Sequence, residues 1–502
     1  MKVKRSIYNI IFGFGAQIIT LAMGIIIPRL ILVGYGSEVN GLLNTVTQIY
    51  AYVALLEAGV GTATIQALYG PIIKGDKEEI SGIFVAAQNY YRRLTTYYFL
   101  CVVLLSVVGP FAIKSDLNPV EIGSVIFLHG MAGVISFYFA ATFKQLLAAE
   151  GKNYVVVIIT FAVQMLTYVA KIVLALAKTN IVFIQLSYFL ITLFQVILYM
   201  AYYRRKYYWV DLKTKPRKGA LKQKNSFLIH EITLTIFNST DTIVLSTISG
   251  LAVASVYAVY NLVFSGLYTI FSTLFNSVRF TLGQIYHENT ERYLKLHDAF
   301  ESIYIGFVFS IISVCYFLIL PFIELYTKGV GDANYLDYRL PILFCSIQLL
   351  SAIRSVSNNL INVAQHATQT VWRTILEAVI NLGVSLIASQ YLGIYGVLLG
   401  TIVALLYRSN DIIIYANTKI LKRKPVRAYK TIALNFALFA VVVAISRYVV
   451  IDIQNYIGFI VNGLVLTIIL VPSFQIANFV SNKSCLQFLK MICSKFKTKK
   501  AI

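Results

Sequence analysis

The run "LAMGIIIPRLILVGYG" at residues 21–36 belongs to an apolar segment that begins near residue 7 and is too long for a buried strand. An α-helix needs about 20 predominantly apolar residues to cross roughly 30 Å of hydrocarbon, and residues 7–33 supply them. The segment continues directly into a second apolar stretch, so we expect it to stay in the protein rather than to be removed as a signal peptide. Arg29, directly after Pro28, is a charge that this membrane helix has to accommodate.

The whole chain has the composition of an integral membrane protein. Of its 502 residues, 58% are hydrophobic, 14% are aromatic and only 13% are charged, which leaves too little polar surface for a soluble protein of this size. The alternating strands of a membrane barrel are absent, and helices are the other backbone that satisfies its own hydrogen bonds in lipid. The sequence therefore predicts an all-α, polytopic membrane protein.

Long apolar segments recur along the chain and predict about fourteen membrane-spanning helices. They are expected near residues 7–33, 39–68, 94–114, 121–147, 154–177, 181–203, 227–248, 251–284, 301–326, 339–364, 370–390, 394–417, 429–449 and 456–481.

The formal net charge of +22 is spread unevenly between the loops. Basic residues gather in alternate loops, above all in residues 203–224 and 419–430 and in the C-terminal tail, whereas few lie in the remaining loops. Such asymmetry follows the positive-inside rule, so both termini are expected in the cytoplasm and the chain in the cytoplasmic membrane. It also argues against nucleic acid as a partner. The basic residues of the predicted outer loops are Lys114, Lys178, Lys328, Arg339 and Arg447.

The basic loops divide the predicted helices into sets. Residues 1–210 are expected to form a first lobe of six helices, residues 211–226 a basic cytoplasmic linker, and residues 227–420 a second lobe of six helices. Residues 421–502 would add two helices and a basic tail. Two similar halves are typical of secondary transporters, whose substrate site lies between them.

The loops offer little room for an enzyme. The predicted outer loops are short, and the inner loops contain no Gly-rich phosphate cradle, no HExxH and no GxSxG. We therefore expect no catalytic residues, no cofactor, no metal site and no ATPase domain. Transport would be driven by a coupling ion such as H⁺ or Na⁺, by the membrane potential or by the substrate gradient. The five cysteines fall in spans or the cytoplasmic tail and predict no disulfide framework, and His297 is placed in a cytoplasmic loop.

Three cations within the predicted spans are candidate functional residues, because an intramembrane charge costs about 2.5–3.5 kcal/mol on the insertion scale unless it faces protein or water. Arg29 and Lys171 lie near the outer ends of their spans. They are either interfacial anchors that snorkel to the headgroups or cations that face a cavity, and the anchor role is favoured for Lys171. Arg354 lies near the middle of its span, from where snorkelling cannot reach water without a cavity, and this depth favours a functional role.

Acids within the spans are candidates for coupling or gating. Glu57 is followed by small residues that let another helix approach, so it either pairs with an arginine, forms an interhelical hydrogen bond or titrates. Asp241 lies in the polar run "FNSTDTIVLS", which includes Asn238. This run either lines a water-filled path, binds a coupling cation or consists of side chains that hydrogen-bond to one another. Arg408 and Asp411, three residues apart on one helix face, are expected to form a local pair.

Several segments resemble the polysaccharide flippases of the multidrug/oligosaccharidyl-lipid/polysaccharide exporter superfamily. "PRLILVGYGSEVNGLLNTV" at 28–46, followed by "LLEAGVGTATIQALYGPIIKGD" at 55–76, is similar to the first helix pair of that family. "STDTIVLSTISGLAVASVYAVYNLV" at 239–263 is similar to the start of its second lobe. "ILEAVINLGVSLIASQYLGIYGVLLGT" at 375–401 is similar to its helix 11–12 hairpin, with Glu377 and Asn381 one turn apart and glycines that allow a tight crossing.

The resemblance implies a transporter that carries polyprenyl-diphosphate-linked oligosaccharide repeat units from the inner to the outer leaflet by alternating access. Arg29, Lys171 and Arg354 would give the cavity its positive potential, while Glu57, Asp241 and Glu377 would oppose or gate it. The polar residues Asn238, Asn381 and Tyr257 are candidates to line the cavity. Polysaccharide polymerases and glycosyltransferases would be partner proteins, and the product would be a capsule or exopolysaccharide.

Alternatives remain within the same superfamily and outside it. A flippase of lipid-linked peptidoglycan precursors would handle a chemically similar headgroup, whereas a multidrug or metabolite exporter would be expected to rely more on acids than on arginines. A membrane glycosyltransferase or polymerase is disfavoured by the short outer loops. A purely structural membrane scaffold would not explain why both lobes contain buried charges.

Overall fold

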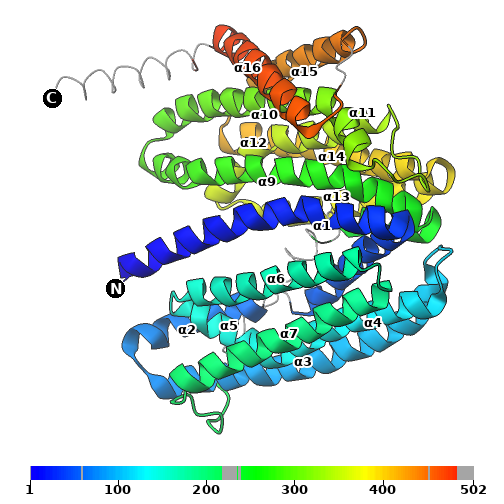
Figure 1. Ribbon diagram of the computed structural model, residues 1–502. Coiled ribbons are helices and arrows are strands. Elements are labelled where there is room, and N and C mark those ends of the chain that lie inside the picture. Colours follow the sequence, from blue (N-terminus) through cyan, green and yellow to red (C-terminus); the bar gives the residue numbers. More distant parts are fainter. Residues whose placement is uncertain are drawn as a thin grey trace. The chain divides into compact units, whose positions relative to one another are not determined.

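The computed structural model describes residues 2–57, 60–217, 235, 239–449, 453–482 and 485. All its regular elements in these ranges are helices, and no strand occurs there (Figure 1). Twelve helices are long and apolar enough to cross a membrane within the described ranges. The chain is thus an all-helical, multi-pass membrane protein, as the sequence predicts.

In the N-terminal half, the predicted spans 121–147, 154–177 and 181–203 agree closely with the structure, whereas the helix predicted to start at residue 94 begins at Lys77. The helices of this half are α1 (Lys2–Val53), the 3₁₀ turn η1 (Ala54–Leu56), α2 (Val60–Lys74), α3 (Lys77–Ala112), α4 (Pro119–Ile135), the π-helical turn η2 (Ser136–Ala140), α5 (Ala141–Ala149), α6 (Asn153–Leu176) and α7 (Ile181–Lys206). Residues 239–248 are also helical.

In the C-terminal half, most helices lie near the predicted spans, but α10 begins eleven residues before the predicted start at residue 301. The helices of this half are α9 (Leu251–Glu288), α10 (Thr290–Tyr326), α11 (Leu340–Ile353), α12 (Ser355–Val363), η3 (Ala367–Thr370), α13 (Val371–Leu392), α14 (Ile394–Tyr415), η4 (Ala416–Ile420), α15 (Val426–Ser446) and α16 (Tyr456–Ser481).

The predicted count of fourteen spans stays a prediction, for two reasons. The predicted spans 7–33 and 39–68 meet in α1, which changes direction at Gly36, where φ is 85° and ψ is 179°. The second of them is then interrupted between Val53 and Val60. Most of the predicted span 227–248 lies outside the described residues.

Polar side chains fix where several helices begin. The carboxylate of Asp76 accepts a hydrogen bond from the backbone N–H of Glu79 at the start of α3. Asn118, Asn180 and Asn455 do the same for α4, α7 and α16. Such caps satisfy backbone N–H groups that the helix itself leaves without partners.

Contacts divide the chain into two compact units. Unit 1 comprises Met1–Ala258 with Gly329–Ala333, and unit 2 comprises Val259–Lys328 with Asn334–Ile502. The predicted lobe limits at residues 210 and 227 rest on loop charge and stay a prediction.

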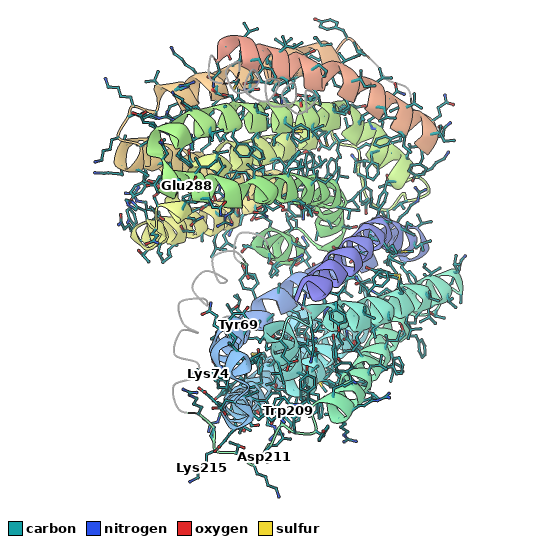
Figure 2. The ribbon with its side chains drawn as sticks, turned by 90° about the vertical axis from the view of Figure 1, so that its left-hand side faces the viewer. Tyr69, Lys74, Trp209, Asp211, Lys215 and Glu288 are labelled. Carbon is teal, nitrogen blue, oxygen red and sulfur yellow. The ribbon has the colours of Figure 1, made fainter. Side chains whose placement is uncertain are left out.

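In unit 1, the segment that follows α7 packs along the start of α3. The backbone N–H of Asp211 donates to Oγ of Ser81, and the ammonium of Lys77 lies 5.7 Å from the ring centroid of Trp209. Figure 2 shows Trp209, Asp211 and Lys215 at the same end of unit 1. In unit 2, α10 packs against α11, α15 and α16, and α13 forms a hairpin with α14 (Figure 1).

Candidate functional site

Unit 2 holds a group of five charged side chains, which we call the charge cluster. It joins three stretches of chain, because one member lies between α11 and α12, two lie on α13 and two on α14. Its members are Arg354, Arg373, Glu377, Arg408 and Asp411.

The hairpin of α13 and α14 positions four of these side chains. Gly393, between the two helices, has a φ of 53°, which favours glycine. A Cβ on Gly396 would lie 2.3 Å from the carbonyl carbon of Ala388, and one on Gly400 would lie 2.2 Å from Oγ of Ser385. The predicted tight crossing is therefore confirmed, and it brings the polar faces of both helices together.

Arg354 lies where a span is interrupted. α11 ends at Ile353 and α12 begins at Ser355, so the helix is broken within the candidate span Leu340–Val363. The hydroxyl of Ser409 on α14 donates to the carbonyl oxygen of Leu350 at 2.8 Å and so satisfies a backbone group just before the break. Broken helices are a common way to present groups to a substrate within a membrane protein.

Glu377 lies between two arginines. Nη1 of Arg354 donates to its Oε1 at 2.5 Å, and Nε of Arg408 lies 3.6 Å from its Oε2. Its side chain is 7% exposed. Glu377 therefore links the interrupted span to the hairpin.

Asp411 also lies between two arginines. Nη1 of Arg408 donates to Oδ2 and Nη1 of Arg373 donates to Oδ1, both at 2.5 Å. The predicted local pair of Arg408 and Asp411 is thereby confirmed. Nη2 of Arg408 donates to the hydroxyl of Thr374 at 2.9 Å.

The charge cluster carries an excess of positive charge, because three guanidinium groups face two carboxylates. The side chain of Arg408 is 4% exposed, whereas those of Arg354 and Arg373 are 20% and 24% exposed. A ligand could therefore reach Arg354 and Arg373 but not Arg408. An anion suits these two residues, because guanidinium groups bind phosphate and carboxylate with paired hydrogen bonds.

Asn381 lies one turn after Glu377 and is fully buried. Its amide nitrogen donates to the hydroxyl of Thr401 on α14 at 2.9 Å. Its Oδ1 has no hydrogen-bond partner in the described part of the chain. The residue extends the polar face of the hairpin beyond the charge cluster.

The remaining predicted acids lie in unit 1. Glu57 lies in the turn after η1 rather than within a helix, and its Oε1 accepts a 3.0 Å hydrogen bond from the hydroxyl of Tyr91 on α3. Asp241 is buried and accepts a 3.0 Å hydrogen bond from the hydroxyl of Tyr257 on α9. Asn238 lies outside the described residues.

The predicted cations of unit 1 are half-buried. Lys171 on α6 places its ammonium 5.8 Å from the ring centroid of Tyr188 on α7, and no carboxylate lies within 4.0 Å of it among the residues described. Arg29 lies in α1, one residue after Pro28. The anchor and cavity roles of these two residues stay predictions.

Sequence reasoning missed Arg373. It lies four residues before Glu377 on the same face of α13, and this spacing is the pattern that could have indicated it. It was overlooked because a cation at the predicted inner end of a span resembles any other positive-inside residue.

No protein-family model matches the sequence, and no curated protein matches it. Solved structures do match its fold. The lipid II flippase MurJ in an inward closed conformation has a TM-score of 0.69 at 12% identity, covering 93% of this chain and 98% of that one. An inward-facing multidrug resistance MATE family transporter of the MOP superfamily has a TM-score of 0.60 at 16% identity, covering 84% and 96%.

The chain has the fold of MOP superfamily transporters. A third match is a MOP superfamily transporter from Pyrococcus furiosus, described as having a binding pocket of reverse polarity, with a TM-score of 0.53 at 16% identity over 83% of this chain and 95% of that one. At such low identity these matches establish the fold, and the function has to be argued from the residues.

Proposed function

We propose that this protein is a transporter that flips polyprenyl-diphosphate-linked oligosaccharide repeat units across the cytoplasmic membrane for surface polysaccharide synthesis. The observation that carries the proposal is the charge cluster, in which two partly exposed arginines lie on a fold shared with a lipid II flippase. A diphosphate headgroup is an anion that arginine binds with paired hydrogen bonds. No enzymatic step is required.

The geometry of Glu377 suggests how the headgroup binds. Without substrate, Glu377 is the counter-ion of Arg354 and compensates its buried charge. An incoming phosphate would take over Arg354, and Glu377 would keep Arg408 as its partner, 3.6 Å away. Because each charge has a partner before and after the exchange, substrate enters without leaving a buried charge uncompensated.

The proposal extends to unit 1 and to topology. Arg29 and Lys171 would add positive potential along the substrate path, and Glu57, Asp241 and Glu377 would gate it or bind a coupling H⁺ or Na⁺. Fourteen spans with both termini in the cytoplasm would agree with the positive-inside pattern. Glycosyltransferases would supply the substrate, and polysaccharide polymerases would consume it.

A flippase of lipid-linked peptidoglycan precursors is the second candidate, favoured by the fold shared with MurJ. Its substrate would bind the same arginines. An exporter of cationic drugs is disfavoured, because a partly exposed cluster with excess positive charge repels cations.

Deletion of the gene tests the proposal. Membrane extracts of the deletion strain are profiled for polyprenyl-linked saccharides by mass spectrometry, and surface polysaccharide is scored alongside. The proposal predicts accumulation of complete repeat units together with loss of surface polymer, both restored by the wild-type gene. Truncated saccharides would indicate an enzyme, accumulated peptidoglycan precursor would favour the second candidate, and an unchanged profile would overturn both.

A further inference from the structure

The first turns of α10 hold a buried group of metal-ligating side chains in unit 2. His297, Asp298 and Glu301 each offer one ligand atom, and these atoms lie within 4.8 Å of one another. His297 and Glu301 are one helical turn apart, so they share a face. The prediction that places His297 in a loop is wrong, because α10 begins at Thr290 and His297 is fully buried within it.

Polar atoms of this group lack hydrogen bonds in the described structure. Nδ1 of His297 lies 3.5 Å from Oδ1 of Asp298, too far for a good hydrogen bond, and neither Nε2 of His297 nor Oε1 of the buried Glu301 has a hydrogen-bond partner. The hydroxyl of Tyr293, which is fully buried, also lacks a hydrogen-bond partner, and the ring of Tyr293 lies 5.6 Å from that of His297. Buried polar groups almost always bond to protein, to water or to an ion. Their concentration at one place therefore points to a bound species.

Asp298 is held in position from the other side. Arg423 donates to both of its carboxylate oxygens, at 2.6 and 3.0 Å, and Nη1 of Arg427 lies 2.7 Å from Oδ2. Outer partners of this kind orient a ligating carboxylate. The arginines are 24% and 43% exposed, so water screens their repulsion of a cation. Glu301 takes part in no ion pair within 4.0 Å in the described ranges, and its charge would face the cation directly.

We infer that His297, Asp298 and Glu301 bind a divalent metal ion that accepts imidazole and carboxylate ligands, with Zn²⁺ preferred over Mn²⁺. One imidazole nitrogen and two carboxylate oxygens are typical ligands of Zn²⁺. Mg²⁺ and Ca²⁺ prefer oxygen ligands alone and would bind weakly. The ion would satisfy His297 and Glu301 and hold the first turns of α10 in place. This site is independent of the proposed transport.

The full-length protein, purified in detergent without chelators, is measured for metal content by elemental mass spectrometry. Roughly one Zn²⁺ or Mn²⁺ ion per chain is expected, as for a structural site. The protein is then stripped with a chelator and titrated with each metal alone. Zn²⁺ and Mn²⁺ should raise the Tm, and Mg²⁺ or Ca²⁺ at equal concentration should not. A wild-type protein with no bound metal and no such Tm rise overturns the inference, whatever the variants do.

Variants locate the site. Glu301→Gln and His297→Gln should lose the bound ion and the Tm rise, whereas Glu291→Gln, an exposed acid in the first turn of the same helix, should keep both. If the first two variants retain the ion, residues outside this group bind it and the inference is wrong. If these variants fail to fold, the metal content of the wild-type protein and the metals that raise its Tm decide whether the inference holds.

Discussion

Arg354 donates a 2.5 Å hydrogen bond to Glu377, which lies 23 residues later in the chain. This bond ties the interrupted span to the α13–α14 hairpin and gives each of the two buried charges a partner. Arg408 faces the second oxygen of the same carboxylate. Glu377 is therefore shared between an accessible arginine and a buried one.

Glu377→Gln is expected to destabilise the protein. The substitution leaves two guanidinium groups facing a neutral amide, and removal of one partner of a buried ion pair costs about 3–5 kcal/mol. The double variant R354Q/E377Q should recover part of this loss, because it also removes a charge left without its partner. Thermal unfolding in detergent measures both. Arg339→Gln, at a 73% exposed arginine that pairs with Asp337, is the control and should change the Tm little. A Tm for E377Q equal to that of R339Q would contradict the account.

Arg354→Lys should reduce transport while the protein level stays normal. Lysine keeps the charge but cannot offer the paired, planar donors that bind phosphate bidentately. The measurement is the amount of surface polysaccharide in the complemented deletion strain, normalised to protein in the membrane. Arg339→Lys serves as the control. Full activity of R354K would show that Arg354 supplies charge alone or has no contact with the headgroup.

Arg29→Gln separates the two roles open to Arg29. A cavity cation should be needed for transport, so R29Q is expected to accumulate lipid-linked saccharide in an otherwise normal membrane. An interfacial anchor would instead show as a lower protein level, which Arg29→Lys would restore. The account predicts the first result, with R29K restoring transport only in part.

Gly396→Ala should damage the hairpin that carries the charge cluster. Its new Cβ would lie 2.3 Å from a backbone carbon of α13, which cannot move without separating the two helices. We expect a loss of at least about 2 kcal/mol, within the range known for overpacked sites. Gly383→Ala, on α13, has no heavy atom within 4 Å of the new Cβ and should be neutral or slightly stabilising. Equal Tm values for G396A and G383A would refute the tight crossing.

The sequence predicted those features that depend on local properties. The expected helix 181–203 corresponds to α7, and the expected helix 456–481 coincides with α16, because length and hydropathy determine membrane spans. The pair of Arg408 and Asp411 followed from a spacing of three residues on one helix. The glycines of the α13–α14 crossing were likewise visible in the sequence.

Features that depend on packing between distant segments could not be predicted. Nothing in the sequence joins Arg354 to Glu377, or Asp241 to Tyr257, because these contacts arise only when separate helices meet. The start of α10 was misplaced for another reason. Its first turns carry charged residues and histidine, so hydropathy assigns them to a loop, although they are helical and His297 is buried.

The central claim is that the protein moves an anionic lipid-linked saccharide and that Arg354 binds its headgroup. The most direct test is flipping of a purified polyprenyl-diphosphate-linked saccharide in proteoliposomes, measured as the fraction of sugar that becomes accessible to an external lectin. Wild-type protein should raise this fraction above that of protein-free vesicles, and R354A should abolish the rise while R339A retains it. Equal fractions in wild-type, R354A and protein-free vesicles would contradict the claim.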